Sequence, residues 1–148
     1  MVKDLFCLKG KTALVTGGGQ GIGRAVCLAL AEHGANIIIN YKSNRDKAEQ
    51  TQKEVLESGV KSWLWEYNLD SETLKSDYSD FCNRILQYAD ILVLNASIQI
   101  RKAWDEVTLS EFNNQINVNL RTSLELIQHC VPYMEKNRWG RIITLGSV

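Results

Sequence analysis

The chain alternates short apolar runs with stretches of helical periodicity, and this alternation constrains its fold more than any other feature. The continuous apolar run 91–94 is typical of a strand buried on both faces, which occurs mainly in parallel sheets. The stretch 22–33 carries apolar residues at helix spacing and ends at Gly34. Because parallel neighbours need crossover helices, the pattern predicts an α/β protein.

The same reasoning predicts five strands and four helices along the chain. The strands are expected at 12–16, 35–40, 61–69, 91–94 and 141–145, and the helices at 22–33, 46–58, about 72–88 after a Ser71 cap, and 111 to about 137. The last helix is expected to be capped by Thr108 or Ser110 and interrupted near Pro132. No repeat or linker appears, so residues 1–148 are expected to form one domain built on a three-layer, doubly wound parallel sheet.

Composition excludes several function classes. The chain is 45% apolar and 23% charged, as in an ordinary soluble domain. Seventeen basic residues balance seventeen acidic ones, so no bulk field favours nucleic acid or an anionic membrane. The start, Met1 to Phe6, has an early acid and no long apolar core, unlike a secretory signal. We therefore expect a cytoplasmic protein with neither nucleic-acid nor membrane partners.

The cysteines and histidines suggest no metal site. Cys7, Cys27, Cys82 and Cys130 are scattered without a C-x-x-C pair, and we expect buried, reduced thiols rather than disulfides. His33 and His129 are both expected on helices, where packing or surface roles are more typical than catalysis.

A glycine loop follows the first predicted strand and reads Thr16-Gly17-Gly18-Gly19-Gln20-Gly21-Ile22-Gly23. Its G-x-x-x-G-x-G spacing is a variant of the dinucleotide-binding fingerprint G-x-G-x-x-G. A sharp strand-to-helix turn, close approach to a pyrophosphate and tight helix packing each exclude a Cβ. The helix N-terminus then offers free N–H groups to phosphates. A glycine-rich turn without ligand is the alternative, whereas a P-loop is excluded because no Gly-Lys-Ser/Thr follows.

The end of the second strand indicates which nucleotide binds. A carboxylate there would bind the ribose 2′-hydroxyl of NAD and repel a 2′-phosphate. This chain instead reads Asn40-Tyr41-Lys42-Ser43-Asn44-Arg45, with no acid before Asp46. Lys42, Ser43 and Arg45 could pair with a 2′-phosphate, so NADP is predicted in preference to NAD. The alternative is a solvated loop with two chance charges.

Five ordered features together resemble the short-chain dehydrogenase/reductase family: the glycine loop, Asp70, Asn95-Ala96-Ser97, Asn119, and the segment Gly140 to Val148 with Ser147. The last segment is most similar to 3-oxoacyl-carrier-protein reductases and sugar or gluconate dehydrogenases. The resemblance spans the chain and implies a Rossmann fold, here reaching only the fifth strand.

The resemblance also implies roles. Asp70 would bind the adenine amino group, Asn95-Ala96-Ser97 would support the sheet beside the adenine ribose, Asn119 would lie at a helix break and hold a water in a proton relay, and Ser147 would bind the substrate oxygen. The predicted catalytic residues are therefore Ser147 and Asn119. The predicted cofactor-binding residues are Gly17, Gly19, Gln20, Gly21, Ile22, Gly23, Tyr41, Lys42, Ser43, Leu69, Asp70, Asn95, Ala96 and Ser97.

Two departures from the family pattern affect cofactor binding. Leu94-Asn95-Ala96-Ser97 stands where the family usually has Asn-Asn-Ala-Gly, so an amide is lost and a Cβ is added. Gln20 occupies a position where many NADP-dependent relatives carry arginine, which leaves Lys42 and its neighbours as the main candidates for the 2′-phosphate.

The family's Tyr-x-x-x-Lys pair does not occur anywhere in the 148 residues. We therefore expect a fragment of an oxidoreductase, incomplete at its C-terminus, that does not turn over alone and exposes an apolar stripe on its long helix. The implied substrate is a small carbonyl or alcohol; sugars, sugar acids and acyl thioesters all fit. The intact relative would be a dimer or tetramer.

Two other function classes compete with the oxidoreductase interpretation. One is a non-catalytic nucleotide sensor, which nucleotide binding without turnover in the full-length protein would favour. The other is a structural interaction module, which the absence of any nucleotide binding would favour. Ser147 and Asn119 favour the enzyme, since neither alternative needs them.

Overall fold

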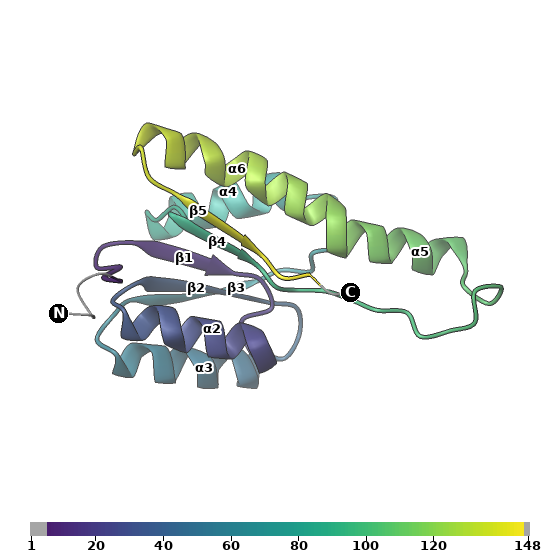
Figure 1. Cartoon of the computed structure of the whole chain (residues 1–148), viewed down its shortest axis with the longest axis horizontal. Helices are drawn as coiled ribbons and strands as arrows, with labels where there is room; N and C mark the ends of the chain where they lie inside the picture. The colour runs from purple at the N-terminus through teal and green to yellow at the C-terminus, as the bar shows by residue number, and fades with distance from the viewer. Residues whose placement is uncertain (1–5, 147–148) are drawn as a thin grey trace.

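In the computed structural model, which describes residues 6–146, five parallel strands form one sheet in the order β3-β2-β1-β4-β5 (Figure 1). The strands are β1 (Thr12–Val15), β2 (Asn36–Tyr41), β3 (Ser62–Glu66), β4 (Ile91–Leu94) and β5 (Arg141–Thr144). The helices are α2 (Gly21–Glu32), α3 (Arg45–Glu57), α4 (Leu74–Ile85), α5 (Leu109–Ile116), the π-helix η1 (Asn117–Arg121) and α6 (Thr122–Lys136). The chain winds outward from β1 to β3 and then adds β4 and β5 on the other side, which confirms the predicted doubly wound sheet.

Helices cover both faces of this sheet. Figure 1 shows α2 and α3 on one face and α4 and α6 on the other, with α5 extending beyond the end of the strands. Successive β1 residues pack into different layers: Ala13 and Val15 join the core beneath α2 and α3, and Leu14 joins the core beneath α4 and α6. Because β1 and β4 are buried along their whole length, the predicted continuous apolar strands and the three-layer architecture are confirmed.

The predicted Ser71 cap is wrong. Helix α4 begins at Leu74 with Thr73 at the N-cap position, and neither the Thr73 side chain nor the Ser71 side chain caps it. The Ser71 hydroxyl instead lies 3.1 Å from the Thr73 hydroxyl and accepts a hydrogen bond from Thr73 N, within a turn between β3 and α4. Ser71 and Thr73 are both of a residue type that caps helices, but the Ser71 hydroxyl forms its hydrogen bonds within the preceding turn.

The long helix is interrupted at Asn117–Arg121, where the resemblance placed a break at Asn119, and not near Pro132 as the proline suggested. Thr108 is the cap of α5, in a capping box with Glu111, which decides between the two predicted candidates. The regular α-helical pattern breaks at η1, whereas α6 continues through Pro132 to Lys136. A proline removes one N–H bond, and the carbonyl it leaves, on Gln128, belongs to an exposed residue that water can reach.

The outer surface of α5–η1–α6 carries the apolar stripe expected from the sequence. Its large exposed side chains are Leu109, Phe112, Ile116, Leu120 and Leu124. Strand β5 is an edge strand, and all four of its residues are exposed. Between residues 6 and 146, none of the helices is both long and apolar enough to cross a membrane.

The cysteines differ in burial. Cys27, Cys82 and Cys130 are buried and free, as predicted. The prediction is wrong for Cys7, which is exposed because it precedes β1 and belongs to neither core.

Candidate functional site

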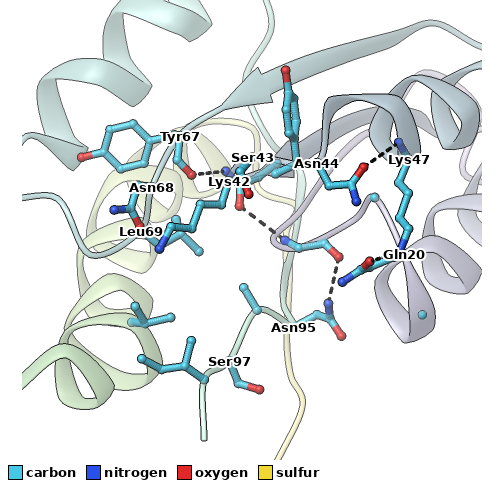
Figure 2. A pocket seen from close by; sticks show the side chains of 18 of the residues that line it. Gln20, Lys42, Ser43, Asn44, Lys47, Tyr67, Asn68, Leu69, Asn95 and Ser97 are labelled. Carbon is cyan, nitrogen blue, oxygen red and sulfur yellow. Dashed lines mark hydrogen bonds between the residues drawn. The ribbon is translucent and has the colours of Figure 1, made fainter. Parts of the chain in front are cut away.

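A cavity of about 460 Å³ opens at the carboxyl edge of the sheet (Figure 2). Its walls are the loops that follow β1, β2, β3 and β4, closed by α5 and η1. Strands β1 and β4 flank the point where the winding direction reverses, which is where open α/β sheets bind ligands. The fold therefore places the glycine loop and the ends of three other strands around one space.

The glycine loop has the backbone geometry that its sequence predicts. Gly17 and Gly21 adopt positive φ values of 64° and 54°, a conformation that favours glycine. A Cβ on Gly23 would lie 2.3 Å from Gly17 O and 2.6 Å from the Asn95 side-chain nitrogen. The first turn of α2 can therefore contact the loop and β4 only because residue 23 has no side chain.

Asn95 and Thr16 fasten this loop to the end of β4. The Asn95 amide donates to Thr16 O at 2.9 Å and to Gly17 O at 3.3 Å. The Thr16 hydroxyl accepts hydrogen bonds from the backbone of Asn95 and Ala96. Asn95, Ala96 and Ser97, all predicted from the sequence, line the cavity.

Asn40, at the end of β2, was not among the predicted site residues. Its side chain is 1% exposed; it accepts from Gly17 N and donates to Trp65 O and Tyr67 O, each at 3.3 Å. One amide thus joins the glycine loop to the ends of β2 and β3. The signal in the sequence was a polar residue directly after Ile37-Ile38-Ile39, in a strand buried on both faces.

Charge around the cavity is entirely positive. Of the residues that line it, only Lys42 and Lys47 are charged, and none is acidic. Lys47, which the sequence analysis missed, donates to Gln20 Oε1 at 2.9 Å. Arg45, expected near a 2′-phosphate, instead pairs with Glu49 at 2.7 Å on exposed helix surface outside the lining. Arg45 and Glu49 are four residues apart on the same helix, a spacing at which opposite charges pair.

The segment after β3 divides between the cavity and the long helix. Tyr67, Asn68 and Leu69 line the cavity. Asp70 does not; its Oδ1 accepts from Asn117 Nδ2 at 3.1 Å, and its backbone carbonyl accepts from Arg121. The predicted adenine contact of Asp70 stays a prediction.

Of the two predicted catalytic residues, Asn119 lies within the described part of the chain. Asn119 lies in the π-helical break, as the resemblance implied, and its side chain pairs with both backbone polar groups of Ile98 at 2.9 Å. This pairing fixes the loop after β4 and leaves the proposed water relay untested. Ser147 lies outside the described residues.

The remaining predicted cofactor residues lie together. The predicted residues that line the cavity are Gly17, Gly19, Gln20, Gly21, Ile22, Tyr41, Lys42, Ser43, Leu69, Asn95, Ala96 and Ser97. Gly23 packs against Gly17 and Asn95 behind this lining. The lining also includes Asn44, Ile98, Asn114 and Val118, which the sequence analysis did not predict. Asn114 and Val118 come from a helix distant in sequence, and only its packing brings them here.

Two groups beside the cavity, the Cys27 thiol and the Tyr41 hydroxyl, have pKa values raised above their ordinary range. Burial raises the pKa of the Cys27 thiol, beneath the loop, to about 12. Burial and a hydrogen bond to Glu66 raise the pKa of Tyr41, whose hydroxyl donates to Glu66 at 2.8 Å. Within residues 6–146, no group of three or more potential metal-ligating side chains lies together. The geometry thus suits the binding of a phosphorylated ligand.

Comparison with known proteins agrees with this geometry. Residues 11–148 match the family model described as short chain dehydrogenase. A 3-oxoacyl-[acyl-carrier-protein] reductase of Staphylococcus aureus is 35% identical over 139 residues, 93% of this chain and 56% of that protein. A hydroxynaphthalene reductase-like protein of Metarhizium robertsii is 31% identical over 141 residues, covering 95% and 52%. The chain thus spans about half the length of the curated relatives it matches.

Solved structures give the same result. The crystal structure of an NADP-bound 3-oxoacyl (acyl-carrier-protein) reductase from Agrobacterium tumefaciens superimposes with a TM-score of 0.91 at 31% identity, covering 100% of this chain and 57% of that one. A putative gluconate dehydrogenase from the same organism gives a TM-score of 0.87 at 32% identity, covering 96% and 56%. The glycine loop, the doubly wound sheet and the helix break at Asn119 therefore have one common explanation: this chain belongs to the short-chain dehydrogenase family.

Proposed function

We propose that the cavity binds a nicotinamide adenine dinucleotide, NADP in preference to NAD, and that the protein is an oxidoreductase acting on a small carbonyl or alcohol. The observation that carries the proposal is the cavity itself: a glycine-rich loop, a helix N-terminus and two lysines face one space without a carboxylate. The Agrobacterium relative holds NADP, which supports the same cofactor here.

The chain's own residues suggest how each part of the cofactor is held. The loop from Gly17 to Gly21 and the N-terminus of α2, whose first turn contains no acidic residue, would bind the pyrophosphate. Leu69 and Asp70 would lie at the adenine, and Asn95 to Ser97 beside the ribose. The cofactor, when bound, supplies the hydride acceptor or donor.

The preference for NADP depends on Lys42 and Ser43 directly after β2. Lys42 is exposed, lines the cavity and forms no ion pair within residues 6–146. A lysine in this place attracts a 2′-phosphate dianion, and the absence of a lining carboxylate removes the repulsion that would favour NAD.

The chemistry that follows binding depends on residues outside the described part of the chain. Ser147 is proposed to bind the substrate oxygen, and Asn119 to hold the loop at Ile98 and to support a proton relay. Since the 148 residues contain no Tyr-x-x-x-Lys, we expect them to bind the nucleotide without turnover. The names of the relatives suggest acyl thioesters, aromatic ketones and sugar acids as substrate classes.

Titration calorimetry with NADP⁺ and NAD⁺ tests the proposal. We expect tighter binding of NADP⁺, and we expect Lys42→Glu to weaken it about tenfold while leaving NAD⁺ within about twofold, since one charge-assisted contact is reversed. Lys53→Glu, a charge reversal at an exposed lysine of α3 outside the lining, is the matched control. Binding of neither nucleotide would support the structural-module alternative, and binding without carbonyl reduction by the full-length protein would support the nucleotide sensor.

A further inference from the structure

Two lysines reach the cavity from different elements. Lys42 directly follows β2, and Lys47 lies in the first turn of α3. Figure 2 shows Lys42 directed toward Asn68 and Leu69, and Lys47 directed toward Gln20 on the glycine loop. The two ammonium groups therefore serve different sides of the same opening.

The backbone of Lys47 is fixed against the glycine loop. Its N–H donates to the side chain of Asn44, the cap of α3, at 3.2 Å. One turn later, the buried Thr51 hydroxyl donates to Gly19 O at 3.1 Å. Between them, Ala48 packs so closely that a Cβ on Gly19 would lie 3.3 Å from its Cα. Helix α3 thus presents Lys47 at the rim of the loop.

The Lys47 ammonium has no acidic partner within residues 6–146. The ion pairs there join Lys11 to Asp90, Arg24 to Glu54, Arg45 to Glu49 and Lys102 to Glu111. Its hydrogen-bond partner is the neutral amide oxygen of Gln20. A phosphate dianion is a stronger acceptor for an ammonium than an amide is, so the contact can be exchanged for a ligand.

We propose that Lys47 is a specificity-determining residue, which releases Gln20 and binds the phosphate on the adenine ribose. This inference rests on the proposed function, because it requires NADP in the cavity. Lys47, in the first turn of α3, would then be the second cation at this phosphate, beside Lys42. Gln20 then holds the ammonium in place when the cavity is empty.

The test compares two probes that differ only in the phosphate at issue, adenosine 2′,5′-bisphosphate and 5′-AMP. For Lys47→Gln we expect the Kd of the bisphosphate to rise about tenfold and that of 5′-AMP to change less than about twofold, because one charge-assisted contact is lost. Lys53→Gln, an exposed lysine on the same helix outside the lining, is the matched control and leaves both unchanged. Gln20→Glu, which gives Lys47 a carboxylate partner, produces the same selective loss without altering Lys47.

The outcomes separate this inference from the proposed function. If the unaltered chain does not prefer the bisphosphate, the proposed NADP preference fails, and the role of Lys47 fails with it. If the chain prefers the bisphosphate but Lys47→Gln keeps the ratio of the two Kd values, Lys47 is excluded while the NADP preference stands. An equal loss for both probes, with unchanged circular dichroism, would assign Lys47 to the 5′-phosphate and overturn the inference.

Discussion

The glycine loop and the long α5–η1–α6 helix differ in how tightly their residues are packed and hydrogen-bonded. Around the loop, the side-chain amides of Asn40 and Asn95 link strand ends to the loop, and a Cβ added at Gly23 has no room. In the α5–η1–α6 helix, α6 packs against the sheet, while an apolar stripe that runs from α5 into α6 is exposed to solvent. We therefore expect substitutions that add or remove side-chain volume to be destabilising at the loop and nearly neutral on the outer surface of the helix.

The largest effect is expected from two leucines that lie two residues apart on α6, on opposite sides of the helix. Leu126 is fully buried and Leu124 is 55% exposed. Leu126→Ala should lower the free energy of unfolding by about 3 kcal/mol, because it opens a cavity in the core, and Leu124→Ala should change it by less than about 0.5 kcal/mol. Urea denaturation of both variants measures the difference. Equal losses would mean that the exposed stripe is buried in solution.

A smaller loss of stability is expected at the loop, accompanied by a loss of binding. Gly23→Ala places a Cβ against Gly17 O, and the backbone shift should cost about 2 kcal/mol and weaken NADP⁺ binding at least about tenfold. Gly146→Ala is the matched control, because a Cβ there meets no atom within 4 Å. Unchanged NADP⁺ affinity in Gly23→Ala would show that the loop does not need this close contact.

The smallest effect concerns pH at the start of α5. Hydrogen bonds from Lys102, and from the Thr108 backbone and hydroxyl, lower the pKa of Glu111 from 4.5 to about 2. Because the folded pKa is depressed, the contribution of this group is present above the unfolded value and is lost as pH falls toward about 2. An NMR titration of the Glu111 carboxyl and of the α5 amides checks this, and Glu111→Gln should remove the pH dependence. A normal pKa for Glu111 would show that the capping box is open in solution.

Patterns of near neighbours predicted most of the fold. The bounds of β2, α2 and α3 lie within a residue or two of the prediction, because their apolar periods and terminal glycines act locally. The start of α4 was misplaced, and so was the interruption that Pro132 suggested, whereas the break that the resemblance implied at Asn119 is present. Ser71 and Pro132 are strong local signals, and contacts distant in sequence, such as Thr122 with Leu69, accompany the break at η1 instead.

The sequence alone determined a parallel α/β chain with a glycine loop at its first strand-to-helix turn. Strand burial, helical period and the need for residues without a Cβ all depend on residues close together in the sequence. Only the tertiary structure decided which polar groups meet at that loop. Asn40, Lys47 and Asn114 gave weak signals or none in the sequence, because their roles depend on what the other strands and helices bring within hydrogen-bond distance or into the same cavity wall. The pairing of Arg45 with Glu49 likewise came from the structure, and its predicted contact with a 2′-phosphate stays a prediction.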